Sequence, residues 1–193
     1  SLGRLGAHEG DDPAVADALV ALAGSSRSGD RTLRHAASLA IAGAADAARL
    51  DELVVDPSPQ VRLAACIALR RLRDDRLQRL LDDTCDLVAI EAARAIHDLP
   101  LDHLLPALAA RGATGPTDDA FIRRAVSAAE QVGTAEAARA LLAVVARRET
   151  PAEARAEAID ALRSWAVPPK VNRVTGVWLP RTAPRDAAVA QGV

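Results

Sequence analysis

The chain has 193 residues, of which half are apolar, 2% are aromatic and none is Met or Tyr. Alanine and leucine favour helices, whereas strand-rich domains depend on β-branched and aromatic side chains, so this composition predicts an all-α protein. The formal net charge of −2, from 24 basic and 26 acidic residues, supplies no overall attraction for nucleic acid or an anionic membrane.

The first 12 residues are interpreted as the remnant of a preceding structural repeat. Leu2 and Leu5 align with Leu69 and Leu72 of a later helix, so the matching helix would begin before Ser1. Because a helical array needs a polar capping unit at its end, we expect the chain to be part of a larger protein.

One helical pattern recurs five times between residues 13 and 165. Its clearest copy is Val61–Leu72, in which apolar or small residues recur at three- and four-residue spacing and therefore share one face of a helix. Proline and capping residues between the copies predict helix ends. The copies begin at Leu33, Val61, Val88, Phe121 and Ala154, and second helices are expected at about 13–23, 46–55, 74–81, 101–110 and 134–148.

The segment from Asp56 to Leu72 resembles the second helix of a HEAT repeat, in the short bacterial form that also occurs in bilin-lyase-like proteins. The resemblance covers roughly residues 13–165. It implies an all-α fold of about five helix pairs wound into a right-handed α-α superhelix, a HEAT-repeat solenoid. HEAT repeats occur in scaffolds, inhibitors, lyases and glycosylases, so the resemblance predicts the fold more narrowly than the function.

Three copies carry an arginine at their second position, and an acidic residue precedes each arginine. In HEAT repeats an Asp–Arg ladder joins successive units, and the resemblance implies the same structural role here. Anion binding by these arginines is the alternative. The expected ladder residues are Asp30, Arg34, Asp56, Arg62, Glu149 and Arg155.

Three further positions in each copy point away from the apolar stripe, and in a curved array they line the concave face on which partners dock. In the first three copies these positions include four aliphatic residues, which we expect to form an exposed apolar patch of the kind that marks an interface. Coverage of the patch by the first helices or by loops is the alternative. The expected partner-binding residues are Leu39, Leu63, Ile67, Arg70, Ile90, Arg94, His97, Arg123, Glu130 and Arg163.

No catalytic, metal or cofactor site is expected. His97 and His103 lie close in sequence, but Pro100 separates them into different helices, and a solvated turn is favoured over a metal site. The chain has no Gly-x-Ser-x-Gly motif, Cys–His arrangement or phosphate-binding glycine loop. Cys66 is interpreted as an inert packing thiol. We expect no nucleic-acid partner, because a glycosylase of this fold needs a basic, aromatic groove. No apolar run approaches the ~20 residues of a membrane span, so no membrane insertion is expected.

The repeat pattern ends after Leu162, and residues 166–193 are predicted to form an extended, proline-rich tail. In the simplest interpretation the tail is a lid, with Trp165, Val174 and Trp178 covering the last helix pair. The Trp-x-x-Pro-Pro and Arg-Val-x-Gly-x-Trp-x-Pro motifs of residues 165–180 also resemble the end of the HEAT region in large bacterial secreted proteins. Those proteins begin with a sugar-dehydrogenase-like β-propeller and often end in a c-type haem domain. The chain itself has no Cys-x-x-Cys-His motif.

The leading hypothesis is a non-catalytic protein-interaction scaffold that docks a protein partner or a neighbouring domain on its concave face. The tail resemblance implies a segment of a larger bacterial oxidoreductase in the periplasm; without it, a cytoplasmic location is expected. The alternative is a HEAT-type enzyme or binder that acts on a tetrapyrrole or nucleic acid in the groove. The partner and the oligomeric state are left open.

Overall fold

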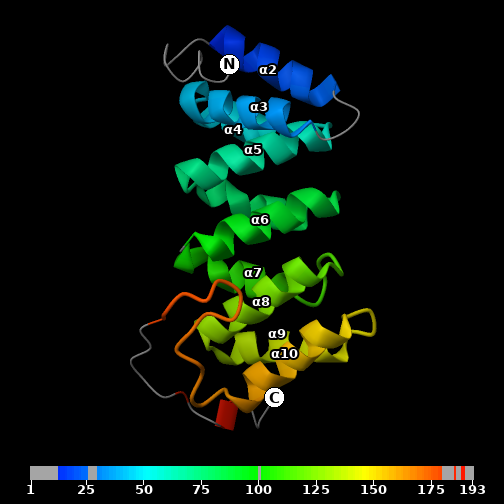
Figure 1. Ribbon diagram of the computed structural model, residues 1–193, viewed down its shortest axis with the longest axis vertical. Coiled ribbons are helices and arrows are strands. Elements are labelled where there is room, and N and C mark those ends of the chain that lie inside the picture. The colour runs from blue at the N-terminus through cyan, green and yellow to red at the C-terminus, as the bar shows by residue number, and fades with distance from the viewer. Residues whose placement is uncertain (1–12, 26–29, 100, 180–184, 186–187, 190–193) are drawn as a thin grey trace. The chain divides into compact units, whose positions relative to one another are not determined.

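The computed structural model describes residues 13–25, 30–99, 101–179, 185 and 188–189 (Figure 1). The interpretation of residues 1–12 as a repeat remnant lies outside these ranges. Within them the fold is all-α, as predicted, and the one β pairing is an isolated antiparallel bridge between Val171 and Trp178. None of the described helices combines the length and apolarity needed to cross a bilayer.

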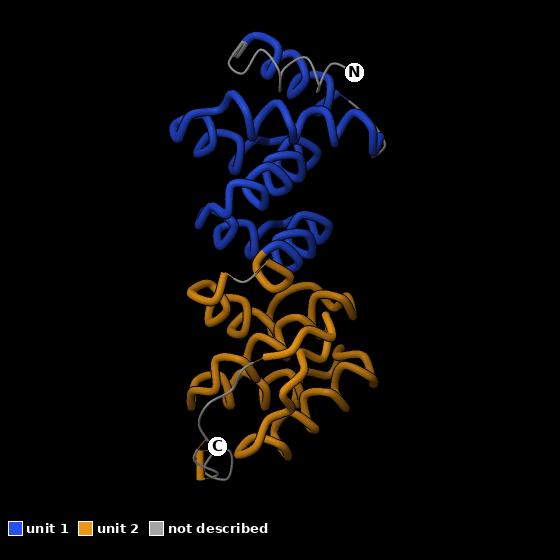
Figure 2. Tube along the Cα trace, turned by 60° about the vertical axis from the view of Figure 1, so that its left-hand side comes forward, with its two compact units in different colours: residues 1–95 blue, residues 96–193 orange. Residues whose placement is uncertain are grey.

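The chain divides into two compact units, residues 1–95 and residues 96–193, and the division falls near the end of α6 (Figure 2). The helices pack mainly with their neighbours in sequence. Unit 1 contains α2 (Pro13–Ser25), α3 (Arg31–Ala44), α4 (Ala47–Leu53), α5 (Pro59–Leu72), the 3-10 helix η1 (Asp75–Asp82) and most of α6 (Asp86–Asp98). Unit 2 contains the end of α6, the 3-10 helix η2 (Asp102–Leu104), α7 (Leu105–Arg111), α8 (Asp119–Val132), α9 (Ala135–Ala146) and α10 (Ala152–Arg163).

Capping residues and a proline mark helix ends of unit 1 where the sequence predicts breaks. The Asp30 carboxylate accepts the backbone N–H groups of Thr32 and Leu33 at 2.9 and 3.2 Å, which caps α3. Pro59 occupies the first turn of α5, where a missing N–H costs nothing. The residue after α5, Arg73, adopts a left-handed backbone with φ 57°. The caps therefore set the lengths of these helices.

Small side chains form much of the core of unit 1. Ala37 on α3 and Ala64, Ala65 and Ala68 on α5 are almost completely buried, and α3 packs against both α2 and α5. Alanine lets helix backbones approach closely because no long side chain intervenes. The segment predicted as a helix at 74–81 is η1, a 3-10 helix, which still buries Leu77, Leu80 and Leu81. At eight residues η1 is longer than most 3-10 helices, and the Asp74 carboxylate caps its start by accepting the Arg76 N–H.

Aromatic and aliphatic side chains are buried between the helices of unit 2. Phe121 and Ile122 of α8 and Leu108 of α7 are fully buried where α7 packs against α8, and α10 packs against α8 and α9. Gly133 ends α8 with φ 70°, a conformation that glycine adopts without strain. After α10, Trp165 is 1% exposed, so the predicted end of the helical region at residue 165 coincides with a core residue.

The described part of the tail turns back over unit 2 as an extended segment. We call residues 170–179 the tail clasp. Its backbone is closed by hydrogen bonds from the Asn172 N–H to the Val177 carbonyl at 2.8 Å and from the Leu179 N–H to the Lys170 carbonyl at 2.8 Å. In Figure 1 the clasp is the orange segment that passes beside α8.

Candidate functional site

A buried histidine lies at the centre of a polar cluster in unit 2. His97 is in the last turn of α6, and its side chain is 0% exposed. Its Nδ1 lies 2.9 Å from Oδ1 of Asp98, and its Nε2 lies 2.9 Å from Oγ of Ser127 on α8. An imidazole that donates from Nδ1 to Asp98 presents Nε2 as an acceptor. His97 therefore links α6 to α8 through its two ring nitrogens.

Asp98 fixes the charge of this cluster. Arg124 of α8 donates from Nε to Asp98 Oδ1 at 3.1 Å and from Nη2 to Oδ2 at 2.9 Å. Burial opposes ionisation of Asp98, but hydrogen bonds from His97 and Arg124, together with the charge of Arg124, outweigh burial and lower the pKa of Asp98 to about 2. The carboxylate is therefore ionised at neutral pH and orients the imidazole.

Asn172 attaches the tail clasp to His97. Its side-chain Oδ1 accepts the backbone N–H groups of Val174 and Thr175 at 2.8 and 2.9 Å, so its Nδ2 must point the other way. That Nδ2 lies 3.3 Å from His97 Nε2. One buried amide thus shapes the clasp and joins it to α6.

Arg173 makes the second attachment. It donates from Nε and Nη2 to Oε1 of Glu130, both at 3.1 Å, and from Nη1 to Oδ2 of Asp160 at 2.7 Å. Glu130 on α8 is buried, whereas Asp160 on α10 is exposed. Burial alone would lower the pKa of Arg173, but the hydrogen bonds that it donates to Glu130 and Asp160, together with their negative charges, raise it. The guanidinium therefore ties the clasp to two helices.

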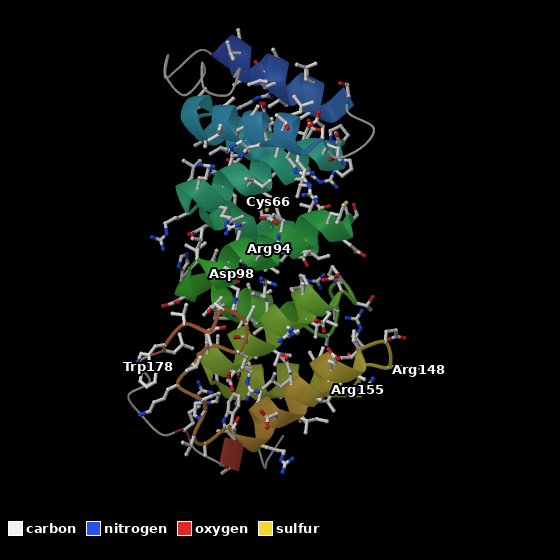
Figure 3. The ribbon with its side chains drawn as sticks, in the orientation of Figure 1. Cys66, Arg94, Asp98, Arg148, Arg155 and Trp178 are labelled. Atoms are coloured by element: carbon white, nitrogen blue, oxygen red, sulfur yellow. The ribbon has the colours of Figure 1, made fainter. Side chains whose placement is uncertain are left out.

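A pocket of about 560 Å³ lies between the clasp and the helices beneath it. Figure 3 labels Asp98 on α6 and Trp178 on the clasp, which both line it. The other lining residues are His97, Asp102, Leu105, Gln131, Val132, Asn172, Thr175, Val177 and Leu179. Its walls combine aliphatic side chains, one indole ring and two carboxylates.

Asp98, His97 and Ser127 have the connectivity of a hydrolase triad, in which the serine must be accessible to substrate. Ser127 is 1% exposed, and it does not line the pocket. The Nε2 that would act as a base also faces the Asn172 amide. With the clasp in place the Ser127 side chain is shielded from solvent, so these contacts support a structural role.

The expected exposed apolar patch of unit 1 requires correction. Leu63 is 8% exposed, and Leu39, Ile67 and Ile90 are half-buried. Because α5 packs against both α2 and α3, Leu63 contributes to the core instead of the surface. The charged residues of the same face form a small network, in which Glu91 lies 3.3 Å from Arg70 and 3.0 Å from Arg94.

The predicted partner-binding residues of unit 2 lie in different environments. His97 and Glu130 are buried and bonded to the clasp. Arg123 forms ion pairs with Glu157 at 2.8 Å and, more weakly, with Asp119 at 3.9 Å. Arg163 is exposed. Part of this face is therefore occupied by the chain's own tail.

The arginine of α5 has a different acidic partner from the one expected. Arg62 donates from Nε and Nη2 to the two carboxylate oxygens of Asp83, at 2.6 and 2.7 Å. Asp56 contributes only its backbone carbonyl to Arg62, at 2.7 Å, and its carboxylate accepts the Ser58 N–H. The residues around Asp56 form a turn, and an aspartate in a turn bonds to the backbone two residues on. Arg62 therefore links α5 to the segment before α6.

The other two predicted ladder pairs also differ from the prediction. Arg155 donates to the backbone carbonyls of Val145, Arg147, Arg148 and Thr150, so it closes the turn after α9. Glu149 lies 3.9 Å from Arg147 instead. Asp30 caps α3, and Arg34 lines a small pocket beside it. Asp30 and Arg155 bond to the backbone because each lies next to a helix end with free carbonyl or N–H groups.

Several residues of the cluster were not among the predicted site residues: Ser127, Arg124, Asn172 and Arg173. Asn172 carries a local signal, since asparagine side chains in turns commonly accept a hydrogen bond from the backbone two residues on. In the described parts of the chain, no group of three or more His, Cys, Asp or Glu side chains could hold a metal ion.

Comparison with protein-family models and with curated proteins finds no match to the chain.

Proposed function

We propose that this chain is a HEAT-like helical-repeat scaffold without a catalytic role, which docks an extended segment of a protein partner or neighbouring domain. The observation that carries the proposal is the tail clasp. It is an extended polypeptide held on the helices of unit 2 by Asn172 on His97 and by Arg173 on Glu130 and Asp160. Helix faces of this chain can therefore bind extended polypeptide through a few polar anchors.

The matching positions in unit 1 are the proposed docking face, which consists of Leu39 on α3, Ile67 and Arg70 on α5, and Ile90 and Arg94 on α6. The three aliphatic residues are half-buried, so each offers a shallow apolar contact. The Arg70 and Arg94 side chains are 35% and 43% exposed and share one carboxylate, that of Glu91. The face therefore carries an excess positive charge.

This charge favours a partner segment that alternates acidic and aliphatic residues. Guanidinium groups bind carboxylates with paired hydrogen bonds, and the half-buried aliphatic residues would contact the apolar side chains between them. In the oxidoreductase that the tail resemblance implies, such a segment would belong to a neighbouring domain.

Selection of peptides from a random displayed library on the whole chain tests the proposal. Peptides rich in Asp, Glu and aliphatic residues are expected. The double variant Arg70→Gln and Arg94→Gln should weaken their binding roughly tenfold, since each exposed ion pair contributes about 0.2–1 kcal/mol and 1.4 kcal/mol is a factor of ten.

The matched control is Arg31→Gln with Arg71→Gln, which removes the same charge from exposed positions of α3 and α5. Equal loss of binding in both double variants would show a non-specific charge effect. Failure to enrich acidic, aliphatic peptides would also contradict the proposed docking face.

A further inference from the structure

The pocket beneath the tail clasp is independent of the proposed docking face, and its lining has a distinct chemistry. We propose that it binds a small organic cation through an aliphatic ammonium group. A volume of about 560 Å³ falls within the range of small-molecule sites in proteins, which is about 300–1,000 Å³. All its lining residues belong to unit 2.

The formal charges on the pocket lining are negative. Asp98 and Asp102 both line it, whereas Arg124, which pairs with Asp98, does not. Asp102 begins η2 and is exposed, and its carboxylate has no ion pair or hydrogen bond with a described residue. The negative charge of Asp98 is thus balanced by Arg124, whereas that of Asp102 has no described counter-charge. An anionic ligand would be repelled, and a cationic ligand would be attracted.

Trp178 supplies an aromatic surface for the same ligand. The chain has two tryptophans, and Trp178 is 61% exposed. The ammonium of Lys170 already lies 5.7 Å from the centre of its ring, within the distance at which a cation is attracted to an indole. Lys170 does not line the pocket. Trp178 does line the pocket, so its ring also offers an aromatic surface to a ligand there.

The remaining walls suit the carbon groups of such a ligand. Leu105, Val132, Val177 and Leu179 give aliphatic surface against which methyl or methylene groups can pack. Asn172 and His97 are bonded to each other and hold the clasp, so they shape the pocket without offering a new anchor. A neutral sugar would use the indole and the carboxylates as well, but it would gain nothing from the unbalanced charge of Asp102.

Calorimetric titration of the whole chain distinguishes these ligands. The probes are choline, its neutral carbon isostere 3,3-dimethylbutan-1-ol, glucose, and Nα-acetyl-lysine amide. Choline or the lysine derivative is expected to bind at least tenfold more tightly than the neutral isostere and than glucose. Tighter binding of choline identifies a free small cation as the source of the ammonium group, and tighter binding of the lysine derivative identifies a peptide side chain.

Asp102→Asn is the decisive variant, because this exposed side chain has no described partner whose loss would disturb folding. It should reduce the preference for the cation over its isostere by at least fivefold. Glu153→Gln removes the same charge from an exposed position of α10 that does not line the pocket, and it should change nothing. Absence of cation binding, equal binding of the isostere, tighter binding of glucose, or an unaltered preference in Asp102→Asn would each overturn the proposal.

Discussion

Arg173 directs two nitrogens at a single oxygen of Glu130, a carboxylate that is 1% exposed on α8. A buried carboxylate is costly without cationic hydrogen-bond donors, so the tail clasp contributes to the stability of the helices that it crosses. This relationship explains why a segment without regular secondary structure is an integral part of unit 2. It also allows the clasp to be tested by stability measurements.

Arg173→Ala should destabilise the protein by about 3 kcal/mol, because removing one partner of a buried ion pair leaves the other with an uncompensated charge. Chemical denaturation monitored by circular dichroism measures the change. Arg163→Ala, at an exposed position of α10, is the matched control and should change the free energy of unfolding by less than about 0.5 kcal/mol. Similar effects of the two variants would show that the clasp contributes little.

The Asp98 carboxylate predicts a defined pH dependence. Its pKa is lowered to about 2 in the folded protein, from an ordinary value of 3.8. A depressed pKa stabilises the folded state above the unfolded pKa, and this stabilisation is lost as the pH falls from about 4 towards 2. The contribution at neutral pH is about 2 kcal/mol.

The Asp98→Asn variant tests the direction of this change in stability with pH. The free energy of unfolding should be lower in the variant than in the native protein at pH 6, and the difference should shrink as the pH falls from 4 to 2.5. A difference that is constant with pH would mean that the charge of Asp98 does not stabilise the fold, and that the variant acts through packing alone.

Double-mutant cycles distinguish the two candidate acidic partners of Arg62, which are Asp83 and Asp56. Its two hydrogen bonds to Asp83, which is 4% exposed in its side chain, predict a coupling energy of about 2 kcal/mol in a double-mutant cycle of Arg62→Ala and Asp83→Ala. The cycle with Asp56→Ala should give a value near zero, since Asp56 reaches Arg62 through its backbone carbonyl, which the substitution retains. A larger coupling energy with Asp56 than with Asp83 would instead support the Asp56–Arg62 pairing that the sequence predicts.

The two thiols should differ in reactivity. Cys66 on α5 is 0% exposed, and burial raises the pKa of its thiol well above the ordinary value, so the reactive thiolate is suppressed. Cys85 is half-buried. In native protein, Ellman's reagent should modify Cys85 much faster than Cys66, with both reacting in denaturant. Fast modification of two thiols in the native protein would contradict the burial of α5.

The sequence predicted the helices far better than the site. The repeated alanine and leucine stripe located α3, α5, α8 and α10, because helix periodicity and capping are local properties. Asn172 and His97 are 75 residues apart, and no local pattern brings them together. The prediction that Leu63 is exposed was wrong, because a helix between two neighbours buries more of its circumference than one stripe. Arg62 was placed correctly on its helix, but its partner depends on tertiary packing.

The proposed docking face of unit 1 is expected to bind an extended acidic segment. Amide NMR spectra recorded while a selected acidic, aliphatic peptide is added test it most directly. Shifts should concentrate at Leu39, Ile67, Arg70, Ile90 and Arg94, and they should be strongly reduced in the Arg70→Gln and Arg94→Gln double variant. Shifts confined to residues away from α3, α5 and α6, or unchanged by that variant, would contradict the claim.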